Sequence, residues 1–287
     1  MNTNHADICC SVIDTTLRDG EQTAGIVFSS EEKVNMVKAM DRLGIPVIEA
    51  GIPIIGESEQ DLMRELLHLK TKAVLMPWNR ANKNDVLASI ACGFPIVHIS
   101  IPISDVHIKY KLNKTQKWVE DTLREVLLFA KSYGVKLSVG AEDASRAEPE
   151  FFLKIANIAA DCGAVRIRYA DTVGSMEPFR LWESMSRLVK LCPLPIEFHG
   201  HNDFGLATAN SLAAAIAGVN YVSVTSTGIG ERAGNACLEE FSTAMKNLYG
   251  YSMGLKEDEM TELTQIVRHA SGRGNIITYV QHVLKNN

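Results

Sequence analysis

Long hydrophobic runs are missing from this 287-residue sequence. No stretch approaches the roughly 20 apolar residues that a membrane-spanning helix requires. Residues 1–7 are polar and do not contain the apolar core of a secretory signal peptide. We therefore expect a soluble, cytoplasmic protein with no membrane partner.

Clusters of basic residues are missing as well. The sequence has 29 Lys and Arg against 34 Asp and Glu, and its formal net charge is −5. Nucleic-acid binding needs a local excess of Lys and Arg, because contacts with the phosphate backbone dominate the affinity. We therefore expect no nucleic-acid partner.

Paired cysteine motifs are the third absence. None of the six cysteines belongs to a Cys-x-x-Cys motif, which argues against a zinc knuckle or a thioredoxin-type site. Four of them lie in apolar stretches, so we expect free, mostly buried thiols in a reducing compartment. The six are Cys9, Cys10, Cys92, Cys162, Cys192 and Cys237.

The sequence does contain a regular alternation of short β-branched runs and longer segments with helical periodicity. Strict alternation predicts a parallel sheet with helical crossovers, and eight units over about 250 residues match the α/β class of the closed (β/α)8 TIM barrel. The alternative is an open doubly wound sheet, but no Gly-x-Gly-x-x-Gly follows the first strand. The predicted strands are 8–14, 46–51, 72–76, 95–101, 135–140, 164–170, 195–199 and 220–225.

The helical segments carry start and stop signals. Residues 31–43 follow the capping candidates Ser29 and Ser30, and Gly44 stands where a left-handed C-cap is usual. Residues 256–284 predict one or two extra helices. We therefore expect a single catalytic barrel domain over 1–287, in which 256–287 form a helical C-terminal extension.

Polar clusters recur at the predicted carboxyl ends of the strands, where a parallel barrel builds its active site. Residues on the helices or at the other end of the strands would not share this position. The clusters are Asp14 to Gln22, Glu49, Glu142 and Asp143, Asp171 and Thr172, His199 to Asp203, and Gly228 to Asn235.

A metal site is predicted within these clusters. His199 and His201 are two residues apart on an extended segment, so both imidazoles point to the same side. With Asp19 as an anionic third ligand, this set suits Mg²⁺, Mn²⁺, Fe²⁺ or Zn²⁺. The alternatives are loop histidines bonded to the backbone, and an Asp19 that caps a turn or pairs with Arg18.

Other polar residues fit chemistry in which negative charge develops. Arg18 can stabilise an enolate oxygen, Glu142 can act as a base or orient one, and Thr172 can bind a substrate carboxylate. The glycine-rich residues 228–235 fit either a phosphate cradle or a tight turn that brings Asn235 towards the metal.

Four of these stretches resemble the metal-dependent acyl-CoA condensing and cleaving barrels. That family includes isopropylmalate, homocitrate and citramalate synthases and hydroxymethylglutaryl-CoA lyase, and the resemblance covers about residues 8–250. The stretches are Asp14 to Gln22, Glu142 to Arg146, His199 to Asn210 and Gly228 to Asn235.

Within the family the chain looks most like the homocitrate synthases of nitrogen fixation, on residues 101–105, 139–146 and 201–210. The resemblance implies an acyltransferase that condenses acetyl-CoA, as co-substrate, with 2-oxoglutarate to give homocitrate and CoA. It implies a divalent metal, Mg²⁺, Mn²⁺ or Zn²⁺, with Asn235 in the metal shell or just outside it.

The resemblance also implies roles for individual residues. Arg18 and Gln22 would stabilise the developing charge, and Glu142 would belong to the proton-transfer apparatus. The implied substrate-binding residues are Arg18, Thr172, His98 and Arg168.

Two departures from the family pattern are visible. Lysine-pathway homocitrate synthases place an Arg on strand five where Ser138 stands here, so we expect Arg168 or Arg146 to take its place. The family's synthases usually continue into helical subdomains that supply a catalytic His and a Tyr to a neighbouring subunit, whereas this sequence stops at Asn287. Neither His269 nor His282 has the surrounding pattern of that His.

We therefore expect either a homodimer or a hetero-oligomer with a separate C-terminal subunit, or else a truncated sequence. Three functional alternatives stay open. One is isopropylmalate or citramalate synthesis. Another is hydroxymethylglutaryl-CoA lyase-type cleavage, whose Gly-Gly-Cys-Pro-type loop is replaced here by 228–231. The third is a non-catalytic subunit of a larger complex.

Overall fold

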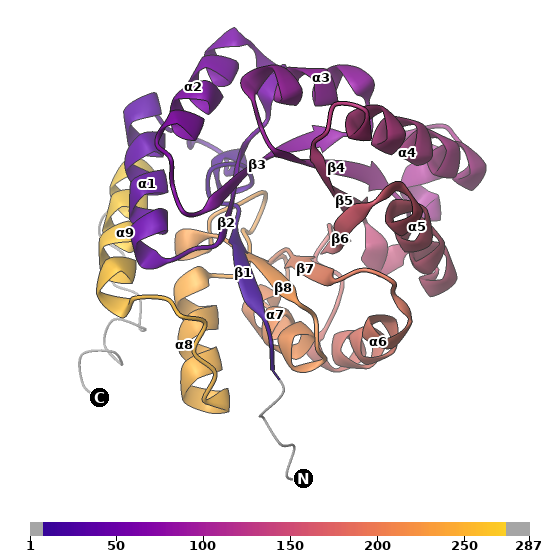
Figure 1. Ribbon diagram of the computed structural model, residues 1–287. Coiled ribbons are helices and arrows are strands. Elements are labelled where there is room, and N and C mark those ends of the chain that lie inside the picture. The colour runs from indigo at the N-terminus through magenta and orange to yellow at the C-terminus, as the bar shows by residue number, and fades with distance from the viewer. Residues whose placement is uncertain (1–7, 274–287) are drawn as a thin grey trace.

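Eight parallel strands close into a barrel in the computed structural model, which describes residues 8–273 (Figure 1). Each strand pairs with the next, and β1 pairs with β8 to complete the ring. The predicted barrel is thus confirmed. The strands are β1 (Ser11–Asp14), β2 (Val47–Gly51), β3 (Val74–Arg80), β4 (Ile96–Pro102), β5 (Lys136–Glu142), β6 (Ala164–Asp171), β7 (Ile196–Gly200) and β8 (Tyr221–Val224).

Helices surround the barrel and connect its strands (Figure 1). The first begins at a complete capping box of Ser29 and Glu32 and ends at Gly44, whose φ is 98°. Local signals therefore set both of its ends as predicted. The helices are α1 (Ser30–Leu43), α2 (Glu57–His68), α3 (Lys83–Cys92), α4 (Gln116–Lys131), α5 (Pro149–Cys162), α6 (Pro178–Leu191), α7 (Ala207–Ile216), α8 (Leu238–Tyr249) and α9 (Glu257–Ala270).

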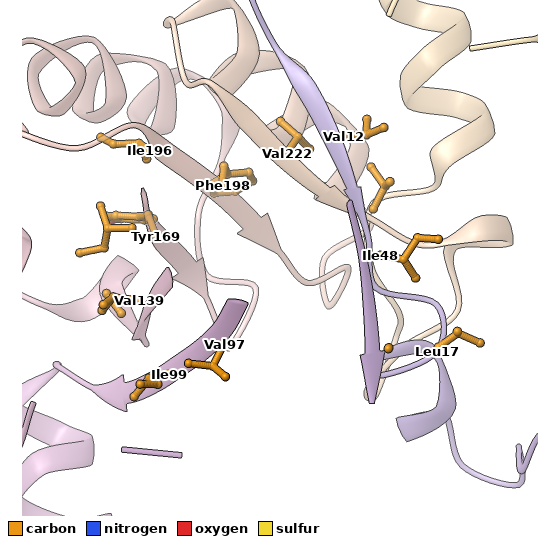
Figure 2. Packing of buried hydrophobic residues seen from close by; sticks show 14 of the residues in the cluster. Val12, Leu17, Ile48, Val97, Ile99, Val139, Tyr169, Ile196, Phe198 and Val222 are labelled. Atoms are coloured by element: carbon orange, nitrogen blue, oxygen red, sulfur yellow. The ribbon is translucent and has the colours of Figure 1, made fainter. Parts of the chain in front are cut away.

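The main apolar core lies between the strands and the surrounding helices. Alternate strand residues such as Val12, Ile48, Val97, Val139 and Val222 belong to it and are buried (Figure 2). Parallel strands connected by helices need this apolar layer on their outer face.

The inside of the barrel is polar instead. Glu49, His98, Ser138, Arg168 and Glu197 are each at most 3% exposed and belong to neighbouring or facing strands. Barrels of this kind usually fill their interior with bulky branched apolar residues. Here the interior holds paired charges directly beneath the active-site end.

Helix α9 lies against α1 on the outside of the barrel (Figure 1). Arg42 pairs with Glu259 at 3.0 Å and with Glu262 at 2.6 Å, and Lys256 N donates to Leu43 O. Residues 257–270 of the predicted C-terminal extension are therefore helical. A second helix expected after them falls on residues 274–287, outside the described part.

Two further observations concern the whole described chain. Between residues 8 and 273 no helix is long and apolar enough to cross a membrane. All six cysteines are free, and four of them, Cys10, Cys92, Cys162 and Cys237, are buried as expected.

Candidate metal centre and active site

Two barrel strands bring three ligand-type side chains together. His199 and His201 leave β7 on the same side, and Asp19 lies in the loop that follows β1. The ligand atoms of the three residues lie within 4.8 Å of one another, and all three are buried. The Nε2 atoms of His199 and His201 are 3.2 and 3.8 Å from Asp19 Oδ2.

The protonation of this cluster suits a cation. Burial and, to a smaller extent, the nearby imidazole of His199 lower the pKa of His201 to about 4, so His201 is neutral near pH 7. Burial opposes ionisation of Asp19, but the Arg18 guanidinium and a hydrogen bond from His199 hold its pKa well below the usual range. A neutral His201 imidazole therefore lies beside the Asp19 carboxylate.

The imidazoles have few partners of their own. Their Nε2 atoms face each other at 3.3 Å, and the Nδ1 atoms of His199 and His201 are buried without a hydrogen bond. Buried polar atoms are rarely left unpaired without a reason. The donor set and the approach of both Nε2 atoms to Asp19 Oδ2 fit a divalent metal of the Zn²⁺, Mn²⁺ or Mg²⁺ type.

Asn235 lies beside this cluster and contacts it through Asp19. Its Nδ2 donates to Asp19 Oδ1 at 2.9 Å, and its Oδ1 is buried without a partner. In the same loop, Glu231 N also donates a hydrogen bond to Asp19 Oδ1 at 3.1 Å. The amide oxygen of Asn235 is therefore a candidate for a fourth ligand or for a contact just outside the ligand set.

Arg18 is fixed next to the metal candidates. Its Nη1 donates to Asp19 Oδ2 at 3.0 Å and to Gln22 Oε1 at 3.4 Å, while its Nε donates to Glu49. The guanidinium carbon lies 5.8 Å from the centre of the Trp78 ring. These contacts leave a preorganised positive charge at the base of the cleft.

An open cleft of about 380 Å³ joins these residues at the carboxyl ends of the strands. The three ligand candidates line this cleft, and so do the predicted site residues Arg18, Gln22, Glu142, Thr172 and Arg168. The other lining residues are Trp78, Ser100, His107, Lys111, Gly140, Ala170, Val173, Glu231 and Arg232. Of these, Gly140, Glu231 and Arg232 lie in stretches that the sequence analysis singled out.

Glu142 belongs to a small charged group at the edge of the cleft. Its Oε1 contacts Lys111 Nζ at 2.6 Å and His107 Nδ1 at 3.0 Å. On the other side of the ring, His107 Nε2 lies 3.2 Å from Arg146 Nη2. A carboxylate joined to an imidazole is an arrangement that can move protons.

Sequence reasoning missed His107 and Lys111. They lie in a short π-helical turn (His107–Lys111) that follows β4, so their position past a strand end was the available signal.

Thr172 and Arg146 have defined partners. The Thr172 hydroxyl oxygen accepts a hydrogen bond from Asp143 N at 2.8 Å, and its carbonyl accepts one from Arg232 at 2.7 Å. Arg146 makes three bonds to the buried carboxylate of Asp143, the shortest at 2.7 Å. Arg146 is thus committed to holding the loop, whereas Thr172 is one of the residues that line the cleft.

Arg168 and His98 lie deeper than the sequence suggested. Arg168 lies at the cleft floor, 3% exposed, with its Nε donating to Glu197 at 2.6 Å and its Nη2 to Glu49. His98 is 0% exposed and is not among the lining residues; its Nδ1 contacts Ser138 Oγ at 2.9 Å. Burial lowers the pKa of His98 well below its usual value, so it is a neutral group beneath the floor.

The glycine-rich residues 228–235 form a tight turn. A Cβ atom on Gly230 would lie 1.9 Å from Asn235 Nδ2, and one on Gly234 would lie 2.1 Å from Gly228 O. No side chain fits at either position. Of the two roles open from the sequence, the turn that brings Asn235 to Asp19 is the one observed.

Comparisons with known proteins agree with this geometry. Residues 10–267 match the family described as HMGL-like. The chain is 46% identical over 262 residues to 2-isopropylmalate synthase 2 of Caldanaerobacter subterraneus, covering 91% of this chain and 68% of that protein. It is also 46% identical over 259 residues to homocitrate synthase 1 of Nostoc sp., covering 90% and 69%.

A third relative has a length closer to that of the matched region. Homocitrate synthase subunit alpha of Clostridium pasteurianum is 42% identical over 240 residues, which are 84% of this chain and 89% of that protein. Among solved structures, the HMG-CoA lyase of Bacillus subtilis superposes with a TM-score of 0.83 over 96% of this chain and 98% of the other. Its identity is 17%, so it supports the fold alone. The family match and the relatives together show that this chain belongs to the HMGL-like family.

Proposed function

We propose that the protein is a condensing acyltransferase that joins acetyl-CoA to 2-oxoglutarate and releases homocitrate and CoA. The observation that carries the proposal is the cluster of Asp19, His199 and His201 beside the fixed guanidinium of Arg18 at the base of one cleft. The relatives named homocitrate synthase and 2-isopropylmalate synthase support an enzyme of the condensing type.

The proposed metal is a divalent cation, Mg²⁺, Mn²⁺ or Zn²⁺, held by Asp19, His199 and His201. When bound, it supplies a Lewis acid that polarises the carbonyl of the 2-oxo acid. Arg18 adds N–H donors that face the oxygen on which negative charge develops, and Gln22 and Asp19 keep its guanidinium in place. The Thr172 hydroxyl is the proposed donor to the substrate carboxylate.

The proposed reaction transfers one proton and forms one carbon–carbon bond. A base removes a proton from the acetyl methyl group, and that carbon attacks the keto carbon of the 2-oxo acid, whose oxygen then takes up a proton. Water hydrolyses the thioester and releases CoA with a free thiol. Glu142, joined to His107 at 3.0 Å, is the group of this chain proposed for the proton transfer.

The cleft offers cationic side chains to a dicarboxylic 2-oxo acid. Arg18, Lys111, Arg168 and Arg232 line it together with the carboxylates Asp19, Glu142 and Glu231, and each of the four cations is ion-paired with a carboxylate of the chain. Cations at these positions suit the second carboxylate of 2-oxoglutarate better than the apolar branch of 2-oxoisovalerate. The alternative is isopropylmalate or citramalate synthesis, which the relative from Caldanaerobacter supports by its name.

We also propose that another chain covers the cleft, in a homodimer or with a C-terminal subunit. Large apolar side chains are exposed in the segments that follow β1, β2, β4 and β7 and in the first turn of α6, at 72% or more. Such a concentration is typical of an interaction surface. The residues are Val27, Ile55, Tyr110, Phe179 and Phe204. One relative is itself named as a subunit alpha. The cytoplasmic location and the single barrel domain over 1–287 stay predictions.

The test is thiol release from acetyl-CoA in the presence of Mg²⁺ or Mn²⁺, with 2-oxoglutarate, 2-oxoisovalerate and pyruvate compared side by side. We expect release only when a 2-oxo acid is added, greatest with 2-oxoglutarate, and none with Asp19→Asn. Greater release with 2-oxoisovalerate would replace homocitrate synthesis by isopropylmalate synthesis. Absence of tight metal binding would favour a non-catalytic subunit. If the chain alone is inactive, a separate C-terminal subunit should restore turnover.

A further inference from the structure

Glu239, near the start of α8, is a buried carboxylate outside the cleft on which four donors converge. Its Oε1 accepts from Ser226 Oγ at 2.8 Å and from Thr264 Oγ1 at 2.7 Å. Its Oε2 accepts from Thr227 N at 2.9 Å and from Cys237 Sγ at 3.0 Å. The residue is 8% exposed and contacts no residue of the metal cluster. Because four donors converge on one buried carboxylate, we ask which neighbouring segment it holds in position.

Thr227, which donates its N–H to Glu239, has an unusual backbone conformation. Its φ is 63° and its ψ 7°, in the left-handed region that β-branched residues rarely adopt. Its own hydroxyl is buried without a partner, so the side chain does not compensate for the cost. Such strain persists only where the surroundings fix the backbone. The Glu239 carboxylate accepts the Thr227 N–H itself, while Ser226 N donates to Thr16 Oγ1 at 2.9 Å and Gly228 N donates to Thr225 O at 3.2 Å.

The conformation of Thr227 sets the path of the loop that follows. The next residue, Gly228, uses its carbonyl to accept from Asn235 N at 3.1 Å. Asn235 in turn contacts Asp19 at 2.9 Å. The two segments of the loop pack closely at Gly234, because a Cβ atom there would lie 2.1 Å from Gly228 O. A shift at Thr227 is therefore passed on to Asn235.

We propose that Glu239 is a positioning residue of the metal centre. By accepting the Thr227 N–H, it holds the loop 227–235 in the conformation that brings Asn235 onto Asp19. The inference extends the proposed metal site and rests on it for its effect on binding. Its effect on the loop does not depend on whether a metal binds.

The experiment compares Glu239→Leu with Glu239→Gln, with Mn²⁺ alone as the calorimetric probe. Leu removes the acceptor, and we expect Mn²⁺ to bind about 10-fold or more weakly, as for other residues that orient metal ligands. Gln keeps one oxygen for Thr227 N–H, while its NH₂ group can donate to the hydroxyls of Ser226 and Thr264. We expect Gln to change Mn²⁺ affinity by about threefold or less, because a neutral acceptor still forms the bond.

A second substitution tests the route through the backbone. Glycine adopts a left-handed conformation without strain, so Thr227→Gly in the Glu239→Leu background should restore most of the lost Mn²⁺ affinity. Thr264→Val is the matched control: it removes a donor to the same carboxylate from α9 but leaves Thr227 untouched. We expect it to lower the melting temperature while leaving Mn²⁺ affinity within about twofold.

Hydrogen–deuterium exchange of residues 226–236 gives a readout without metal. Glu239→Leu should speed exchange there, and Thr227→Gly should reverse the effect. A lower melting temperature with unchanged Mn²⁺ affinity and unchanged exchange would overturn the inference, because Glu239 would then be structural only. If the wild-type protein binds no Mn²⁺, the proposed metal centre fails, and the exchange pattern alone decides whether Glu239 positions the loop.

Discussion

Arg168 on β6 is ion-paired with Glu49 on β2 inside the barrel, although the two residues are 119 positions apart in the sequence. Arg168 is 3% and Glu49 0% exposed. Despite burial, which opposes ionisation, the guanidiniums of Arg168 and Arg18 lower the pKa of Glu49. Arg18 also contacts Asp19 at 3.0 Å, so the charged interior extends directly into the metal cluster.

Arg168→Met should therefore destabilise the fold strongly. The substitution leaves the carboxylate of Glu49 buried with one partner fewer, and breaking such a pair costs about 3–5 kcal/mol. The measurement is the free energy of unfolding in urea. Arg180→Met, whose side chain is 84% exposed, serves as control and should change stability by about 0.5 kcal/mol or less. Equal effects of the two substitutions would contradict the structural role of Arg168.

Gly230→Ala should disturb the metal site by sterics alone. The added methyl would lie 1.9 Å from Asn235 Nδ2 and 3.0 Å from Asp19 Oδ1, so Asn235 must move. We expect a loss of Mn²⁺ affinity of about 10-fold, measured by calorimetric titration. Gly56→Ala is the matched control, because a Cβ atom there has no neighbour within 4 Å. An unchanged affinity in Gly230→Ala would show that Asn235 is dispensable for binding.

Glu142→Gln should lower turnover more than substrate binding. If Glu142 takes part in proton transfer with His107, its removal should reduce kcat about 10²- to 10⁴-fold and leave KM for the 2-oxo acid nearly unchanged. The assay is thiol release at saturating acetyl-CoA. Glu183→Gln, an exposed position on α6, should have no effect. A rise in KM at constant kcat would instead assign Glu142 to substrate binding.

Asp14→Asn should change the pH dependence of stability. Asp14 is fully buried, its Oδ1 accepts from Thr16 N at 2.8 Å, and its Oδ2 has no partner. Burial raises its pKa from 3.8 to about 7. A raised pKa in the folded state means that the contribution of Asp14 is fully present below pH 3.8 and is lost as the pH rises to about 7.

The variant should thus gain stability relative to the wild type as the pH increases. At about 1.4 kcal/mol per pKa unit, the gain between about pH 5 and about pH 8 is on the order of 2–4 kcal/mol. Urea unfolding at both pH values measures it. Asp61→Asn, at an exposed carboxylate, should show no such trend. A constant difference between Asp14→Asn and the wild type would show that Asp14 titrates normally.

The barrel could be predicted from the sequence because its signals are local. Short runs with β-branched residues alternate with helical segments, and Ser29 and Gly44 mark the ends of α1 through caps that depend on neighbouring residues only. His199 and His201 could be placed together for the same reason, since the two-residue period of a strand sets their direction. Asp19 followed from its position after a strand end.

The long-range partners could not be predicted in this way. Strand alternation turns Arg168 inward, but its pairing with Glu49 depends on which strands face each other across the barrel. The sequence suggested both Arg168 and His98 as substrate contacts because a sequence does not show how deep a residue lies: Arg168 lines the cleft, whereas His98 is not among the lining residues. His107 was missed because its approach to Glu142 depends on a π-helical turn that no local pattern announced.

The barrel is closed by the pairing of β1 with β8, where Ser11 lies beside Tyr221. Asp19 belongs to one side of this seam, and His199 and His201 belong to the other. Contacts between such distant segments form only when the whole ring is assembled. An ion bound by these three residues would link the first and last parts of the barrel, and it would stabilise only the completed fold. Neither half of the chain alone can hold it.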